Sequence, residues 1–220
     1  MAEINFLEKY QKVTERDYVQ RVLDDNKAAC ATVAKKWGKD YWDGERKYGY
    51  GGYHYDGRWL PIAKKMAKHF DLKDGDKVLD IGCGKAFLLY ELTQVVPGLK
   101  VHGLDISEYG LAQAKEEISA HLKLGDCVSL PWEDNSFDFV FSINTFHNLE
   151  IYSLEKALKE MQRVSKSKAW LCVESYRNEV EKANLLYWQI TCMSFYSTVE
   201  WNWIYKMWGY KGDYGFIFFE

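Results

Sequence analysis

Short apolar runs alternate with amphipathic stretches through the middle of the chain. The runs that predict buried strands are 77–82 (KVLDIG), 100–105 (KVHGLD), 136–143 (SFDFVFSI) and 168–174 (KAWLCVE), with a brief strand before Gly125. Helical periodicity lies between them, over 86–96, from Ser107 to about residue 121, and over 154–165. Strands separated by helices of this length predict an α/β fold with a doubly wound, mostly parallel sheet.

The first seventy residues have a different pattern. Apolar residues recur at three- and four-residue intervals over 6–37, which predicts helix, and a break near 24–27 divides it into two helices. Residues 41–59 contain five glycines that preclude a regular helix, so we expect a tyrosine-rich loop over 38–59. A short helix is predicted over 59–70, with Pro61 near its first turn.

Beyond residue 174 the pattern is less regular. It predicts a helix over 179–188, an extended strand over 189–196, a helix over 200–208 and a last strand over 214–219. No internal repeat, low-complexity tract or linker divides the chain. We therefore expect an N-terminal part, 1–70, made of helices and the loop, and a sheet-containing core, 71–220.

Composition narrows the class of protein. With 47% hydrophobic and 28% charged residues and a mean hydropathy of -0.40, the 220-residue chain is typical of a soluble globular protein. No apolar run approaches the ~18 residues of a spanning helix, and the charged opening has no secretory signal, so we expect a cytoplasmic protein without a membrane partner. The five cysteines form no CxxC pair, which favours reduced thiols. A net charge of -3 disfavours nucleic acid as a partner.

Aromatic residues are frequent and clustered. They make up 16% of the chain and crowd into 41–59 and 187–219. Tyrosine and tryptophan suit the wall of a ligand pocket because they are apolar and also form hydrogen bonds, although a tryptophan-rich core would have the same composition. Exposed aromatic residues in the last thirty positions would fit a homodimer face or a contact with the tyrosine-rich loop.

A glycine-rich turn follows the strand predicted over 77–82. In VLDIGCGKAF, Gly82 and Gly84 let the backbone approach a ligand and expose amides at the start of a helix. Ligands of open parallel sheets bind at this turn. A dinucleotide fingerprint would have glycine where this chain has Phe87, so an NAD-dependent oxidoreductase is the weaker interpretation.

This turn and three further motifs resemble those of the class I methyltransferases that use S-adenosylmethionine. VLDIGCG is similar to the family's first motif, with Ala86 in place of its last glycine. Asp105 ends the second strand in VHGLDIS, Asp126 follows the third in LGDCVSLPW, and the fourth ends in FSINTFHNLE. The resemblance covers 71–177 and implies the Rossmann-like fold of that family.

The resemblance also implies a donor and its contacts. S-adenosylmethionine would be the methyl donor and S-adenosylhomocysteine the product. Asp80 would hold the methionine amino group, Asp105 the ribose, and Asp126 with the amide of Cys127 the adenine. The implied cofactor-binding residues are Asp80, Gly82, Cys83, Gly84, Asp105, Ile106, Asp126, Cys127 and Asn144. The residues themselves leave open a helix cap at Asp105 and a solvated turn at Asp126.

On the acceptor side, His147 is the candidate general base. It follows the fourth strand, where relatives place acceptor-side residues, and a hydroxyl acceptor would benefit from a base within hydrogen-bond reach. A structural histidine is the equal alternative. No His, Cys or carboxylate cluster has the spacing of metal ligands, so we expect no metal.

Residues 41–59 precede the core at the place where the family carries a variable lid. We expect a mobile lid in which Tyr48, Tyr50 and Arg58 contact the acceptor. Arg46, Lys47 and Arg58 could grip a carboxylate, a phosphate or a sugar acid. The alternative is a packing loop with solvated basic residues.

One further resemblance concerns the acceptor. WGKDYWDG, YGYGGY and YDGRW, with TCMSFYS and FIFFE near the end, look like small stand-alone bacterial methyltransferases of surface-polysaccharide biosynthesis. This implies an enzyme that methylates an oxygen of a small polar or anionic acceptor, such as a sugar or phosphoryl group of a small molecule or glycan. A non-catalytic subunit that binds S-adenosylmethionine and regulates a partner, and an NAD-dependent oxidoreductase, are the alternatives.

Overall fold

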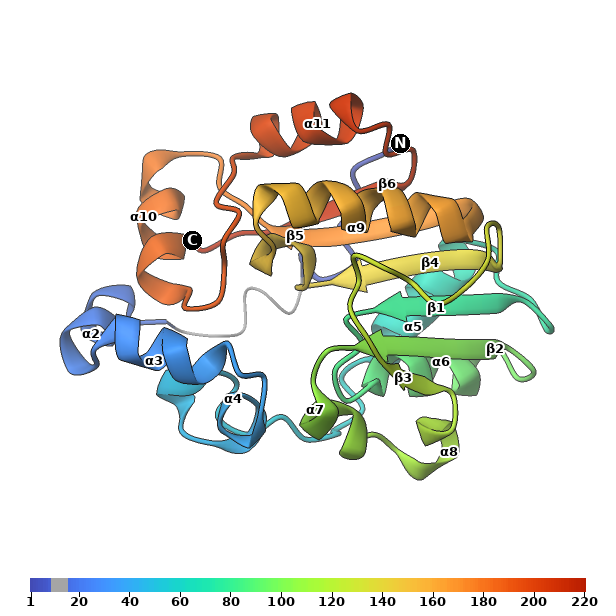
Figure 1. The fold of residues 1–220 in the computed structure, drawn as a ribbon, viewed down its shortest axis with the longest axis horizontal. Coiled ribbons are helices and arrows are strands. Elements are labelled where there is room, and N and C mark those ends of the chain that lie inside the picture. Colours follow the sequence, from blue (N-terminus) through green and yellow to red (C-terminus); the bar gives the residue numbers. More distant parts are fainter. Residues whose placement is uncertain (9–15) are drawn as a thin grey trace.

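A six-stranded parallel sheet forms the centre of the molecule in the computed structural model, which describes residues 1–8 and 16–220 (Figure 1). Its order is β3-β2-β1-β4-β5-β6, and every neighbouring pair is parallel. The strands are β1 (Lys77–Ile81), β2 (Lys100–Asp105), β3 (Leu122–Leu124), β4 (Phe137–Ile143), β5 (Ser165–Glu174) and β6 (Asp213–Ile217). The doubly wound α/β fold predicted from the sequence is confirmed.

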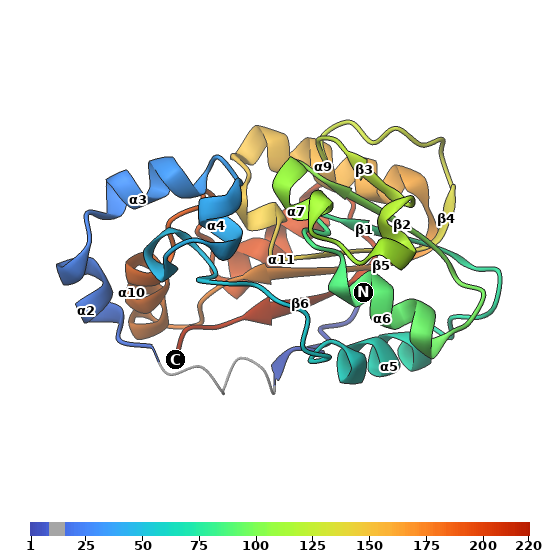
Figure 2. The same ribbon diagram turned by 90° about the horizontal axis from the view of Figure 1, so that it is seen from below.

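Helices cover both faces of the sheet. On one face lie α5 (Leu60–His69) and α6 (Phe87–Val95), and on the other α9 (Ile151–Val164) and α11 (Thr198–Met207) (Figure 2). Val78 of β1 packs in the core beneath α5 and α6, whereas the next residue, Leu79, packs in the core beneath α9 and α11. Because both faces are buried, the central strands are apolar almost throughout, and this made them recognisable in the sequence.

The remaining helices gather near the carboxyl ends of the strands (Figure 1). Here α2 and the 3-10 turn η1 lie with α10, and α3 and α4 lie beside them. Their bounds are α2 (Tyr18–Asp24), α3 (Lys27–Ala34), α4 (Lys39–Asp43), η1 (Arg46–Tyr48) and α10 (Glu179–Trp188). Three short elements lie in the connections between strands: α7 (Glu108–Ala112) and α8 (Glu116–Ser119) between β2 and β3, and η2 (Phe146–Asn148) after β4.

Several predicted elements need correction. The single helix expected from Ser107 to about residue 121 is two short helices, α7 and α8. Residues 189–196 form no strand, because the N–H groups of Met193 and Ser194 both donate to the carbonyl of His147 at 2.9 Å instead of to a neighbouring strand. The loop expected over 38–59 contains α4 and η1.

The N-terminal helices agree with the pattern where they are described. The break predicted near 24–27 is confirmed, since α2 ends at Asp24 and Asn26 caps α3 by accepting the N–H of Ala29. The part of the first predicted helix over 9–15, with Tyr10 and Val13, lies outside the described residues.

The C-terminal aromatic residues belong mainly to the core. Trp201, Tyr205, Tyr210 and Phe216 are buried, and of the aromatic residues in 191–220 only Trp203 is exposed, at 60%. The exposed aromatic surface expected there is therefore reduced to one side chain. All five cysteines are free thiols. Among the described helices, none combines the length and apolar character that crossing a membrane requires.

Candidate active site

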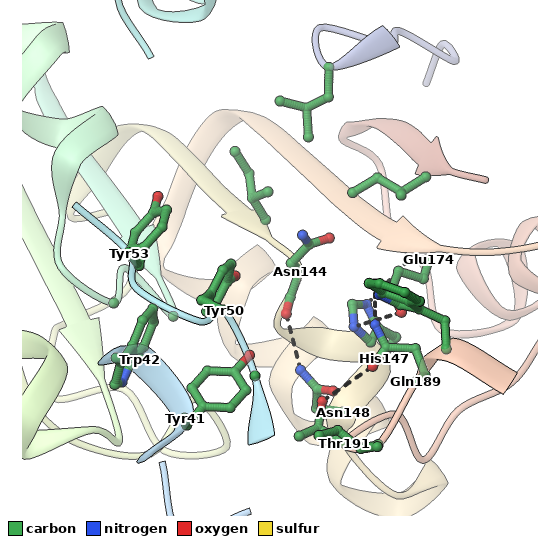
Figure 3. Close-up of a pocket in the computed structure, with 18 of the residues that line it drawn as sticks. Tyr41, Trp42, Tyr50, Tyr53, Asn144, His147, Asn148, Glu174, Gln189 and Thr191 are labelled. Atoms are coloured by element: carbon green, nitrogen blue, oxygen red, sulfur yellow. Dashed lines mark hydrogen bonds and ion pairs between the residues drawn. The ribbon is translucent and has the colours of Figure 1, made fainter. Parts of the chain in front are cut away.

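The carboxyl ends of four neighbouring strands place polar side chains along one edge of the sheet. Asp80 lies near the end of β1, Asp105 ends β2, Asn144 follows β4, and Glu174 ends β5. A cavity of about 390 Å³ opens at this edge, with Asp80, Asn144 and Glu174 in its wall. Its volume lies within the usual range of small-molecule sites. Figure 3 shows Asn144 between a tyrosine-rich wall and the side chains of His147, Glu174 and Gln189.

The turn after β1 leaves no room for a side chain at either of its two glycines. Gly82 has a φ of +80°, and a Cβ there would lie 2.0 Å from Thr145 Oγ1. Gly84 has a φ of +55°, and its Cβ would lie 2.5 Å from the ring of Trp42. Ala86, which stands where the family motif has its last glycine, also has a left-handed φ of 55°. The alanine keeps the shape of the turn at a cost of roughly 1–2 kcal/mol.

Asp105 is fixed by two backbone hydrogen bonds. Gly84 donates its N–H to Oδ2 and Ser107 donates its N–H to Oδ1, each at 2.7 Å. Burial raises the pKa of Asp105, and these backbone hydrogen bonds oppose that rise. Each carboxylate oxygen keeps a further lone pair for a ligand hydroxyl. The side chain that caps α7 is Ser107, which accepts the N–H of Gly110 at 2.9 Å, so Asp105 is not the helix cap.

The residues implied for adenine lie beyond the cavity, beside the end of β2. Ile106 is 59% exposed, so it offers an apolar surface that a flat ring could cover. Asp126 is exposed and accepts the N–H of Val128 at 3.0 Å, as in a solvated turn, and Cys127 is buried. Cys83 lies in the cavity wall. The predicted residues thus share one edge of the sheet, while adenine binding stays a prediction.

Within the described residues, four buried side-chain oxygens of the cavity wall accept no hydrogen bond, those of Asp80, Asn144, Asn148 and Glu174. In the described part of the chain, Asp80 Oδ1 and Asn144 Oδ1 have no donor within reach. Burial and then the charge of Asp105 raise the pKa of Asp80 well above its usual range. Unpartnered buried acceptors are costly, and an ammonium group bound in the cavity would supply the missing donors. The wall therefore fits the amino-acid end of S-adenosylmethionine.

His147 and Glu174 form a buried pair in the same wall. His147 Nδ1 accepts the backbone N–H of Glu174 at 3.2 Å, and its Nε2 lies 3.4 Å from Glu174 Oε2, too long for a strong hydrogen bond. Burial lowers the pKa of His147 to about 3, so the ring is neutral. Burial raises the pKa of Glu174 to about 8, and Gln189 donates to its other oxygen. Both nitrogens of the candidate base thus face Glu174, and a role for His147 as a base stays a prediction.

The tyrosine-rich loop is attached to the glycine turn by a buried ion pair. Lys85 Nζ lies 2.7 Å from both carboxylate oxygens of Asp43 and also donates to the carbonyl of Tyr53. Tyr109 donates its hydroxyl to Asp43 at 2.9 Å. Trp42 donates its Nε1–H to Ser107 Oγ at 2.8 Å. The loop is therefore closed against the core in this structure.

Stacked aromatic rings make the loop's side of the cavity. Tyr50 stacks on Trp42 with 5.3 Å between ring centroids and contacts Tyr53 at 4.7 Å. Arg58 also lines the cavity, and its Nε donates to Asp56 Oδ2 at 2.7 Å. Tyr48 is not in the cavity wall and packs against the small cluster that includes Cys30. The structure thus brings Tyr50 and Arg58 to the site but not Tyr48.

Several lining or anchoring residues were not found from the sequence. They are Asp43, Lys85, Glu174, Gln189, Arg21 and Trp188. Lys85 alone carried a local signal, because a charged residue between Gly84 and the buried Phe87 must find a partner. In the described ranges, 1–8 and 16–220, no group of three or more His, Cys, Asp or Glu side chains is placed to hold a metal ion.

Comparison with known proteins identifies relatives of this chain. A family model described as a methyltransferase domain matches residues 72–212. A demethylmenaquinone methyltransferase of Staphylococcus haemolyticus is 39% identical over 118 residues, which cover 51% of this chain and 48% of that protein. A sterol 24-C-methyltransferase of Gibberella zeae is 35% identical over 127 residues, covering 52% of this chain and 33% of that protein. The chain thus spans between a third and a half of the length of these curated relatives.

A solved structure supports the same fold. The YcgJ protein of Bacillus subtilis superposes with a TM-score of 0.55 and 21% identity, covering 70% of this chain and 68% of that one. At this identity the likeness shows the fold alone. The names of the curated relatives concern a menaquinone precursor and a sterol, so they give no support to the resemblance with polysaccharide methyltransferases.

Proposed function

The chain belongs to the class I methyltransferase family, which uses S-adenosylmethionine as its methyl donor, and we propose that it is an enzyme that methylates an oxygen of a small polar or anionic acceptor. One observation carries the proposal. The cavity at the ends of β1, β4 and β5 joins the glycine turn to the unpartnered buried oxygens of Asp80 and Asn144. A bound ammonium group would satisfy these oxygens, and acceptor-side polar groups lie across the same cavity.

On the donor side, Asp80 and Asn144 would hold the methionine amino group. Gly82, Cys83 and Gly84 would approach it through their backbone, as their turn allows. Asp105 would bind the ribose through its free lone pairs. Ile106, Asp126 and Cys127 would contact the adenine. When bound, S-adenosylmethionine supplies a methyl group on an already activated leaving group, so alignment is the main task of the protein.

On the acceptor side, Glu174 is the group suited to take a hydroxyl proton. Its Oε2 lies in the cavity wall and accepts no hydrogen bond within the described residues. A pKa of about 8 makes its carboxylate a stronger base than an ordinary glutamate. His147 would position Glu174, since both ring nitrogens face that residue. Tyr50 and Arg58 would shape the acceptor's approach from the loop.

A second candidate acceptor is a carbon atom of a quinone or a sterol. The names of the curated relatives favour it. The arginines and Glu174 in the cavity wall favour a polar acceptor, such as a sugar or phosphoryl group. A regulatory subunit without turnover would bind the same donor, and an NAD-dependent oxidoreductase is disfavoured by Phe87 and by the family. We further propose a cytoplasmic enzyme without nucleic-acid or membrane partners, and a homodimer as the assembly to test.

The proposal is tested by ligand binding followed by turnover. Calorimetry should show that S-adenosylhomocysteine binds and NADH does not. S-adenosylmethionine with a deuterated methyl group, added with the enzyme to a metabolite extract, should label a polar or anionic product that mass spectrometry detects. A labelled quinone or sterol would show that the acceptor is of that class instead. Binding of the donor with no labelled product would favour the regulatory subunit.

A further inference from the structure

Three arginines of the cavity wall lie against one tryptophan ring, and Arg16 is the farthest, with its guanidinium carbon 5.4 Å from the ring centroid of Trp188. The guanidinium carbon of Arg21, on α2, lies 4.6 Å from the centroid of Trp188, and that of Arg46, on η1, lies 5.2 Å from it. The side chains of Arg21, Arg46 and Trp188 all line the cavity. Trp188 ends α10 and is followed by Gln189, which donates to Glu174. The ring that the arginines contact is therefore adjacent in sequence to Gln189, the hydrogen-bond partner of the acceptor-side carboxyl group of Glu174.

Among the described residues, no carboxylate lies within ion-pair distance of Arg21 or Arg46, although the charge of Asp25 acts on Arg21. Within the described part of the chain, their side chains donate hydrogen bonds to backbone carbonyls: Arg21 to Trp188 at 2.9 Å and to Lys47 at 3.5 Å, and Arg46 to Gly49. Both guanidinium groups keep N–H donors to spare. Burial and then the charges of Arg21 and Arg16 lower the pKa of Arg46, so like charges crowd at this point.

This proposal rests on the proposed methyl transfer and deepens it. We propose that Arg21 and Arg46, held against Trp188, bind an oxyanion of the methyl acceptor, so that the substrate class is a small molecule bearing a carboxylate or a phosphate. The paired N–H donors of a guanidinium group match the geometry of a carboxylate and of a phosphate. Cation–π attraction to the tryptophan ring holds the two guanidinium groups in place. The oxyanion would relieve the repulsion between the two charges and set the rest of the acceptor toward Glu174.

The test compares matched anionic and neutral probes. Benzoate, phenyl phosphate and uncharged benzamide are titrated into the protein saturated with S-adenosylhomocysteine, and dissociation constants are measured by ligand-observed NMR. We expect at least one anion to bind about tenfold more tightly than benzamide, with the preference shrinking as salt rises. Preference for benzoate alone indicates a carboxylate acceptor, and preference for phenyl phosphate alone indicates a phosphate acceptor. Equal affinity for all three probes overturns the proposal.

Variants locate the binding site. Arg21→Gln and Arg46→Gln should each remove most of the anion preference while the affinity for S-adenosylhomocysteine stays within about twofold of wild type. Arg46→Lys keeps the charge without the fork and should lose only part of the preference, which keeps the test valid if a glutamine variant misfolds. Lys64→Gln, on the exposed side of α5, is the control and should change nothing. An anion preference that persists in both glutamine variants contradicts the assignment. Loss of S-adenosylhomocysteine binding by the wild type would instead contradict the proposed function.

Discussion

Asp43 of α4 and Lys85 of the glycine turn form a buried ion pair that joins the tyrosine-rich loop to the donor site. Lys85 Nζ lies 2.7 Å from both carboxylate oxygens, and its side chain is only 3% exposed. Burial raises the pKa of Asp43, but the hydrogen bonds from Lys85, Tyr53 and Tyr109 outweigh it and hold the pKa below its usual value. The pair couples the position of the loop to the shape of the turn.

Removal of the charge of Asp43 should destabilise the protein strongly. Asp43→Asn leaves the ammonium group of Lys85 buried without a counter-charge, so we expect a loss of about 3 kcal/mol in the free energy of unfolding. Asp71→Asn breaks the exposed pair with Lys73 and should cost less than about 1 kcal/mol. Urea denaturation of both variants measures the difference. Similar losses in the two would show that the loop is not held by this pair.

Tyr50 should matter more for turnover than for donor affinity. It stacks on Trp42 at the cavity, so Tyr50→Ala should lower the single-turnover rate about tenfold or more while the affinity for S-adenosylhomocysteine changes little. Tyr48→Ala is the matched control, because Tyr48 packs outside the cavity. A mobile lid also predicts slower proteolysis within 41–59 when S-adenosylhomocysteine is bound. A fall in melting temperature with an unchanged rate in Tyr50→Ala would make the loop a packing element.

Glu174 should make the stability depend on pH. Its pKa is about 8 in the folded protein because of burial, against the ordinary 4.5. The folded chain then holds a proton that the unfolded chain releases, so this contribution is present below pH 4.5 and is lost as the pH rises toward 8, by at most about 1.4 kcal/mol per pH unit.

A variant with a side chain that does not titrate at position 174 isolates the contribution of Glu174. Glu174→Gln should gain stability relative to wild type as the pH rises from 5 to 8, measured by guanidinium denaturation. The wild-type curve alone is insufficient, because the low pKa of His147, about 3, makes acidification destabilising below its ordinary value of 6.5. Glu179→Gln, fully on the surface of α10, should show a constant difference from wild type. A constant difference for Glu174→Gln as well would rule out the raised pKa.

Methyl transfer should not require a metal ion. The donor's leaving group is already positively charged, so no Lewis acid is needed to activate it. Activity should be unchanged after dialysis against EDTA, measured as methyl incorporation into the identified acceptor. A loss of activity that returns on addition of Mg²⁺ would contradict this expectation.

The sheet and the donor-side acids could be predicted because their signals are local. Val78 and Leu79 are both apolar since each faces a different buried layer, and Asp105 stands at the end of an apolar run. These patterns predict where the strands end, and therefore which residues lie on the donor side of the site.

The acceptor side depends on contacts between residues distant in the sequence. Arg21 meets Trp188 across more than 160 positions, and His147 meets Glu174 only because β4 and β5 are neighbours. Residues 189–196 look like a strand, but their N–H groups bond to the carbonyl of His147. Periodicity describes neighbours along the chain, so it could not reveal these partners.

The two ends of S-adenosylmethionine are expected to bind at separate groups, the amino-acid end at Asp80 and the adenosine at Asp105. Calorimetry with S-adenosylhomocysteine and with 5′-methylthioadenosine, which lacks the amino acid, separates the two. Glu108→Ala, exposed at the start of α7, serves as the control.

We predict that Asp80→Asn weakens S-adenosylhomocysteine at least about tenfold and leaves 5′-methylthioadenosine within about twofold of wild type, whereas Asp105→Ala weakens both at least about tenfold. If both variants bound each of the two ligands with the affinity of the wild type, neither Asp80 nor Asp105 would be a donor-binding residue.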